Sequence, residues 1–281
     1  MQLTNNAQLW PLVDAVPASV SPTWSFPAIA PAAWQSVSCS GLDAQGQFSP
    51  NLGCFLAQLN GMNILIDAGI GPGPNQYLGG LTGNLPARLA EIGVSEKNID
   101  LVVFTHLHMD HIGWAGSPGD SRFPNAPYVA PERDAAFFAQ GAPGMGEHHR
   151  AAYAATMAPL IAAGRVDLLP DGAEIAPGIK YLATPGHTPG HQSVLINTGS
   201  MTLAVTGDVF HCPAQIEQPD WSHRADHDPA LARKSRHEFL KRAVDENWIL
   251  AAGHFRAQLQ FGRAAPHGEG LRFIPEQTPQ R

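Results

Sequence analysis

Four short apolar segments of this chain are each followed by histidine or aspartate. The clearest covers residues 101–104, Leu-Val-Val-Phe, after which residues 105–111 read Thr-His-Leu-His-Met-Asp-His. Such a run is typical of a buried strand, and rigid strands position the loops that follow them. The other three segments are residues 179–183, 201–205 and 248–251, which precede His187, Asp208 and His254. This pattern predicts a sheet-rich α/β layered fold whose polar side chains gather where the strands end.

These polar residues have the chemistry of a metal site. Histidine and aspartate are ligands that zinc and similar divalent ions accept, and residues 105–111 hold three imidazoles and one carboxylate. The chain has 13 His against 17 Lys and Arg, so a clustered set of histidines stands out. The candidate ligands are His106, His108, Asp110, His111, His187, Asp208 and His254. His191 precedes the next predicted strand, so we expect it to hold its loop by hydrogen bonding.

The remaining elements follow from hydrophobic periodicity. Strands are predicted at residues 54–59, 63–66 and 193–197, in addition to those above. Helices are predicted at residues 85–92, 132–140, 147–163 and 229–247, the last beginning at a proline.

Residues 1–45 are predicted to form an irregular N-terminal arm, with one strand near residues 35–39, and residues 46–281 a single domain. The aromatic residues of the arm are expected to pack on the domain or on a second subunit, which suggests a homodimer. They are Trp10, Trp24, Phe26 and Trp34.

Composition excludes several classes of protein. The net charge is −7 and no run of Lys or Arg occurs, so a nucleic-acid partner is not expected. No stretch of 18 apolar residues occurs, so a membrane span is not expected either. The three cysteines include no CxxC pair, which argues against a disulfide framework and an all-thiolate zinc site. The first residues lack the pattern of a secretory signal, so we expect a cytoplasmic protein.

The order of the candidate ligands resembles the HxHxDH…H…D…H signature of the metallo-β-lactamase superfamily, from about Asp67 to His254. The resemblance implies a four-layer αβ/βα sandwich with two divalent metal ions, zinc first, with iron, manganese or cobalt as alternatives. One ion would be held by His106, His108 and His187, and the other by Asp110, His111 and His254. Asp208 and a hydroxide would bridge them, and Asp67 would support the metal loop.

The resemblance also implies a mechanism, in which the bridging hydroxide attacks an electrophilic carbonyl or phosphoryl centre. Asp110 would orient the water and pass a proton to the leaving group. Residues 104–114, 184–193 and 206–214 look like the branch that contains acyl-homoserine lactonases and methyl parathion hydrolase. That branch commonly has a tyrosine that contacts substrate where this chain has His211, which we expect to be either catalytic or structural.

The implied substrate is a small apolar or acyl lactone or ester. Phosphotriester or arylester hydrolysis, iron-dependent persulfide oxidation, a thioesterase activity of the glyoxalase II type and a non-catalytic metal module remain as alternatives. The expected pocket residues are Trp114, Phe210, Phe137, Phe138, Met145, Met157 and Trp221. The six histidines outside the motifs are expected not to bind metal: His148, His149, His223, His227, His237 and His267.

Overall fold

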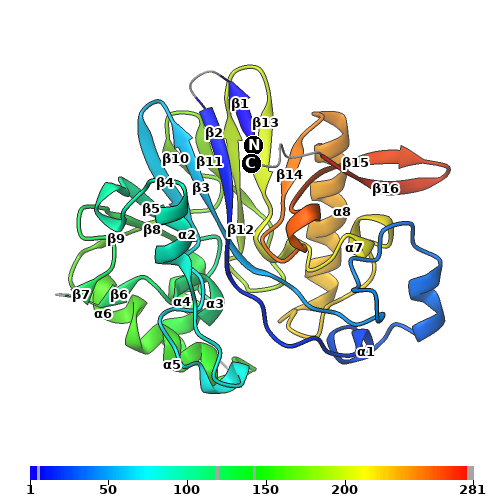
Figure 1. Ribbon diagram of the computed structural model, residues 1–281, viewed down its shortest axis with the longest axis horizontal. Coiled ribbons are helices and arrows are strands. Elements are labelled where there is room, and N and C mark those ends of the chain that lie inside the picture. Colours follow the sequence, from blue (N-terminus) through cyan, green and yellow to red (C-terminus); the bar gives the residue numbers. More distant parts are fainter. Residues whose placement is uncertain (5–6, 118–119, 142–143, 277–281) are drawn as a thin grey trace.

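A computed structural model describes residues 1–4, 7–117, 120–141 and 144–276. Its core is two seven-stranded sheets that face each other (Figure 1). The first sheet has the order β1-β2-β3-β4-β5-β8-β9 and the second the order β10-β11-β12-β13-β14-β15-β16. The strands of the first sheet are Gln2–Thr4, Ala7–Ala15, Leu52–Leu59, Met62–Ile66, Leu101–Val103, Tyr128–Pro131 and Val166–Leu169. Those of the second are Glu174–Ala176, Ile179–Ala183, Gln192–Asn197, Thr202–Val205, Ile249–Ala251, Phe261–His267 and Gly270–Pro275.

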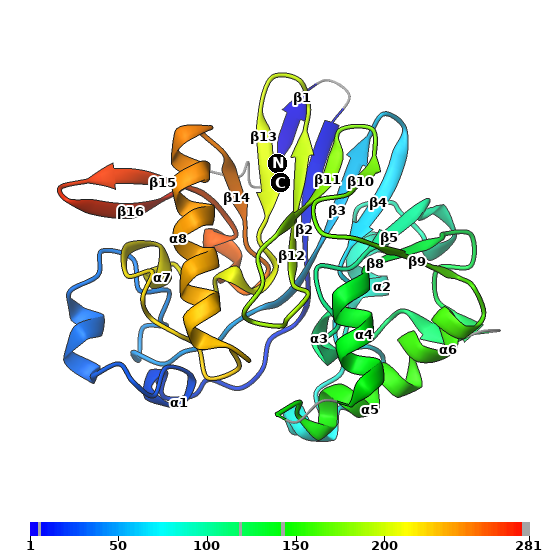
Figure 2. The ribbon, with the colours of Figure 1, turned by 180° about the vertical axis from the view of Figure 1, so that it is seen from behind.

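Helices cover the outer face of each sheet, which gives the predicted four layers (Figures 1 and 2). The first sheet is covered by α2 to α6, and the second mainly by the long α8. One apolar cluster fills the space between the sheets and includes Leu9, Val103 and Leu203. Two further clusters lie beneath the helices. The helices are α2 Leu85–Glu91, α3 Met109–Ile112, α4 Glu132–Gln140, α5 Glu147–Ala155, α6 Met157–Ala162, α7 Ala214–Glu217 and α8 Pro229–Asp245.

The helix predicted over residues 147–163 is broken into α5 and α6 at Thr156. Pro159 explains the break, because its ring clashes with the carbonyl four residues earlier and it has no N–H to donate. The Thr156 side chain caps the end of α5 by donating to the Ala152 carbonyl at 2.8 Å.

The prediction for residues 1–45 is wrong at its start. Residues Ala7–Ala15 form β2, which pairs with β3 from Ala7 opposite Leu59 to Ala15 opposite Leu52. Pro11 within this stretch obscures the strand pattern, since proline weakens a strand prediction. The strand predicted near residues 35–39 is also wrong, because Pro31–Gln35 form a 3₁₀ helix. Between β2 and that turn lies the one-turn helix α1, Pro22–Ser25.

Within the described residues, no helix is long and apolar enough to cross a membrane.

Candidate metal centre

The loops after β5, β11, β13 and β14 meet at one edge of the sandwich. Strands β13 and β14 are parallel neighbours. Strand β12 lies between β11 and β13 and is antiparallel to each, so β11 runs in the same direction as β13. Their carboxyl ends therefore face the same edge. The loop after β5 brings His106 and His108 to this edge from the other sheet. The site therefore joins the two sheets.

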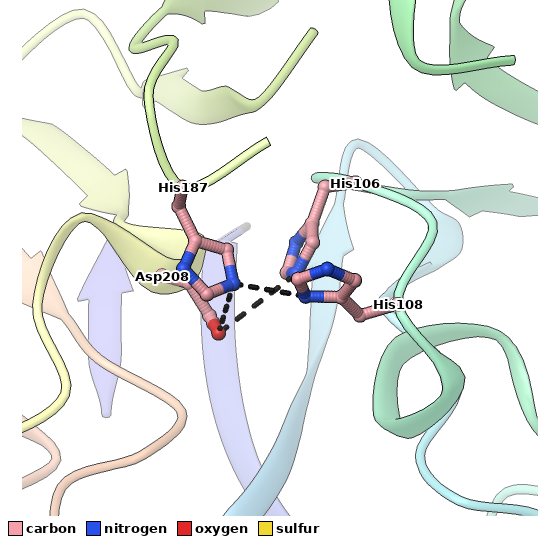
Figure 3. A group of neighbouring side chains, drawn as sticks. All are labelled: His106, His108, His187 and Asp208. Atoms are coloured by element: carbon pink, nitrogen blue, oxygen red, sulfur yellow. Dashed lines mark hydrogen bonds and ion pairs between the residues drawn. The ribbon is translucent and has the colours of Figure 1, made fainter. Parts of the chain in front are cut away.

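Four buried side chains form the first half of the site (Figure 3). His108 Nδ1 lies 3.1 Å from His106 Nε2 and 2.9 Å from His187 Nε2. Asp208 Oδ2 is 3.1 Å from His187 Nε2 and 3.8 Å from His106 Nε2. Three ring nitrogens and one carboxylate oxygen thus point at a common centre, as the side chains in Figure 3 show.

Asp110, His111 and His254 form the second half, and Asp208 lies between the halves. His254 Nε2 is 3.0 Å from Asp208 Oδ2, and His111 Nε2 is 3.2 Å from Asp208 Oδ1. Asp110 Oδ2 is 3.8 Å from both of these ring nitrogens. The structure therefore gathers all seven candidate ligands, with Asp208 in the central position.

Hydrogen bonds leave two atoms of this cluster without a partner. His111 Nε2 and Asp208 Oδ1 are buried and have no hydrogen-bond partner, although buried polar atoms normally have one. Burial raises the pKa of Asp208, but the four histidines His254, His111, His187 and His106 outweigh it and hold the pKa well below its usual range. Lone pairs that converge around a buried carboxylate fit a site for two divalent ions, which would satisfy these atoms.

Comparison with known proteins agrees with this geometry. The sequence model of one family, the metallo-beta-lactamase superfamily, matches residues 54–254, which include every candidate ligand. The chain belongs to the metallo-β-lactamase superfamily.

The chain has low sequence identity to individual members of this superfamily. An N-acyl homoserine lactonase of Bacillus thuringiensis is 28% identical over 183 residues, 63% of this chain and 64% of that protein. The chain thus spans a little less than two thirds of the length of these curated relatives. Among solved structures, AidC, a dizinc quorum-quenching lactonase in complex with an acyl-homoserine product, has a TM-score of 0.85 at 21% identity, with 100% of this chain and 97% of that chain covered. The hydrolase AbOPH has a TM-score of 0.82 at 24% identity, with 99% and 97% covered. The two structural likenesses establish the superfamily fold.

Asp67 and His191, which were expected to support loops of the site, lie beside the candidate ligands. Asp67, in a left-handed conformation with φ of 62°, accepts a hydrogen bond from the Thr105 backbone at 2.8 Å and is 2.9 Å from His111 Nδ1. His191, which was expected to hold its own loop, lies with Nδ1 2.8 Å from Thr184 Oγ1, and its Nε2 accepts from the Asp208 backbone N–H at 2.8 Å. These contacts fix which ring nitrogen of His111 faces the site, and they fix the backbone of Asp208.

Sequence reasoning missed two supports of the other histidines. Asp226 Oδ1 lies 3.2 Å from His187 Nδ1, and the Asn51 carbonyl oxygen lies 2.7 Å from His254 Nδ1. Each holds the far nitrogen of a candidate ligand, so that Nε2 faces the centre. Asp226 belongs to an irregular loop and Asn51 acts through its backbone, so neither has a sequence signal.

Gly207, next to Asp208, has a backbone conformation and surroundings that favour glycine. Its φ is 53°, and a Cβ there would lie 2.5 Å from His191 Nε2 and 3.0 Å from the Thr105 Cβ. We expect Gly207→Ala to destabilise the fold by about 1–3 kcal/mol through backbone strain, and more through the clash. Denaturant unfolding measures the loss, and Gly199→Ala serves as a control because open space surrounds that glycine at a similar φ of 85°. Equal losses in the two variants would show that the contact with His191 is unimportant.

A cavity of about 500 Å³ opens over the metal centre. Its floor includes Asp110 and Asp208, and its walls are mostly apolar. Much of the wall comes from three segments that were not expected in the pocket, at residues 17–25, 48–52 and 77–79. The cavity matches the size and polarity of small-molecule sites.

None of the seven expected pocket residues is among those that line this cavity. Trp114, Phe138 and Met157 are core residues beneath the first sheet, with Phe137 and Met145 packed against them. The Trp114 indole N–H donates to Asp14 at 2.9 Å. Phe210 belongs to the core of the second sheet, and Trp221 packs on Trp34, with ring centres 4.7 Å apart. These seven apolar side chains therefore pack against other residues and do not line the cavity.

Four histidines outside the ligand set line the cavity instead: His148, His149, His211 and His223. His149 stacks on His108 with ring centres 3.8 Å apart, and His223 stacks on His211 at 3.9 Å. Three of them lie outside the sequence motifs, because helix α5 and an irregular loop bring them to the site.

Proposed function

We propose that this chain is a metal-dependent hydrolase that opens lactones or cleaves related esters, with two zinc ions held by the seven gathered side chains. The observation that carries the proposal is the position of this cluster at the floor of a largely apolar cavity. The relatives support it, since an N-acyl homoserine lactonase is 28% identical and AidC, described as a dizinc lactonase, has the same fold.

The two groups of ligand side chains, with Asp208 between them, would hold the two ions. When bound, two such ions polarise a carbonyl group and lower the pKa of water into the neutral range. Asp110 is the most exposed carboxylate of the cluster, with 16% of its side chain accessible against 5% for Asp208. Its oxygen can therefore reach the cavity, accept a proton from the attacking water and return it to the leaving oxygen.

His211 is suited to bind the substrate carbonyl. Both of its ring nitrogens are buried without a hydrogen-bond partner, and the ring lines the cavity. Burial lowers the pKa of His211 to about 4, so the ring is neutral at pH 7 and carries one N–H. We propose that this N–H donates to the carbonyl oxygen as negative charge develops on it.

Metal analysis together with a substrate panel tests the proposal. We expect two zinc ions per chain, rapid opening of N-hexanoyl-homoserine lactone and slower turnover of paraoxon, a thioester and a β-lactam. Chelation is expected to abolish turnover, and added zinc to restore it, because the proposed reaction depends on the ions. Faster turnover of paraoxon would establish a phosphotriesterase instead, and one iron per chain with oxygen uptake would establish a redox enzyme.

A further inference from the structure

His149 lies in the first turn of α5, beside the metal centre but outside it. Its ring stacks on His108 with the planes 23° apart, and it lines the cavity. It belongs to none of the groups of side chains that converge closely enough to share an ion among the described residues. Its function therefore needs an explanation other than metal binding.

The hydrogen bonding of His149 fixes its proton. The Met109 backbone N–H donates to Nδ1 at 3.2 Å, so Nδ1 carries no hydrogen. A neutral imidazole then carries its hydrogen on Nε2. No described residue accepts a hydrogen bond from Nε2. The atom is also not fully buried, because it does not belong to the buried atoms that lack a partner. The ring thus offers a free N–H donor beside the candidate ligands.

The charges around the cavity indicate what this donor would bind. The carboxylates in the lining are Asp110 and Asp208, both assigned to the metal centre, and the one Lys or Arg among the described lining residues is Arg224. The Arg224 guanidinium lies over the exposed Trp24 ring at 3.8 Å from its centre, at the rim. A neutral donor in a largely apolar cavity matches an uncharged carbonyl oxygen.

We infer that His149 is a specificity-determining residue whose Nε2–H donates to a second carbonyl of the substrate, such as an amide beside the scissile ring. The inference rests on the proposed function, because it takes the reacting carbonyl to lie over the metal centre. A substrate of this class has three parts: a lactone or ester, an amide carbonyl and an apolar chain. The chain would lie along the wall formed by residues such as Val20, Phe48 and Leu52.

Two substitutions separate the atoms of the ring. His149→Asn keeps an acceptor close to the position of Nδ1 for the Met109 N–H but removes the Nε2–H donor. His149→Gln reaches the position of Nε2 with an amide N–H. Each variant is compared with the wild type on N-hexanoyl-homoserine lactone and on γ-decalactone, which has a six-carbon chain and no amide. Zinc content is measured in parallel, since a change in the stacked His108 would alter it.

We expect His149→Asn to lower kcat/KM for the amide-bearing lactone by roughly three- to tenfold through KM, the effect of one hydrogen bond. Its kcat/KM for γ-decalactone is expected to stay within about twofold. His149→Gln is expected to keep the wild-type ratio between the two substrates.

Equal losses on both lactones in His149→Asn would overturn the inference, because they would reveal a purely structural role. So would a wild-type enzyme that opens γ-decalactone but not the amide-bearing lactone, although the proposed function would then stand. If the wild type opens neither lactone and cleaves no related ester, the proposed function fails and the inference fails with it.

Discussion

Replacing Asp110 by asparagine is expected to reduce kcat for lactone opening by at least about 100-fold, the usual contribution of a positioned general base. The asparagine keeps the shape of the side chain but cannot accept the proton of the attacking water. Asp110 is the cluster member whose carboxylate is most accessible from the cavity, and its Oδ2 lies 3.8 Å from His111 and His254. Steady-state kinetics at pH 7 measure the change.

Two controls make this result interpretable. Zinc content distinguishes the loss of a base from the loss of an ion, because asparagine is also a weaker ligand. Asp245→Asn, at an exposed position on α8 paired with Lys241, is expected to leave kcat unchanged. A zinc-loaded Asp110→Asn variant with wild-type turnover would rule out the proposed proton transfer.

Replacing Arg236 by methionine is expected to lower the free energy of unfolding by about 3–5 kcal/mol, because it removes the buried guanidinium that faces the buried Asp226 carboxylate. Arg236 is fully buried and its guanidinium lies 3.6 Å from Asp226, the carboxylate that contacts His187. It also donates to the carbonyls of Val209, Pro219 and Trp221 at 2.7–3.1 Å. One side chain thus fixes both the loop that carries Asp208 and the loop whose Asp226 contacts His187.

Denaturant unfolding measures this loss, and chelator competition measures zinc affinity in the same samples. We expect affinity to fall about 10- to 100-fold, as for other residues that orient a metal-binding histidine. Arg242→Met, on the same helix with 41% of its side chain exposed, is expected to change stability by less than about 0.5 kcal/mol. Similar stabilities for the two variants would show that the contacts of Arg236 are dispensable.

The candidate ligands could be predicted from sequence because each follows a short apolar strand. Residues 101–104 are a buried run, and the loop that follows it therefore holds His106 and His108 at the end of the sheet. The resemblance of these residues to the superfamily signature implied the superfamily and its four-layer fold, and both are confirmed by the family match and the structural likenesses. The sequence was informative here because a buried strand requires a run of apolar residues and a metal site requires ligand residues such as His and Asp.

The cavity could not be predicted, because its walls come from loops and turns without periodicity. Trp24 lies in the one-turn helix α1 and Tyr77 in a 3₁₀ turn, and both are far from the motifs in sequence. Large apolar residues such as Trp114 and Phe138 suggested a pocket, yet packing between sheet and helix uses them. Apolar character alone does not distinguish a core residue from a binding residue.

The side chains of the site come from both sheets, so metal binding would be coupled to the folding of the chain. His106, His108, Asp110 and His111 follow a strand of the first sheet, whereas His187, Asp208 and His254 follow strands of the second. An ion held between them would bind the folded chain and not the unfolded one, so its binding would add to folding stability by mass action, by about 4 kcal/mol at a free concentration 1,000 times the dissociation constant. Chains made during zinc starvation would lack this contribution and would open more often to proteases. The abundance of the enzyme, and not only its turnover, would then follow the supply of the metal.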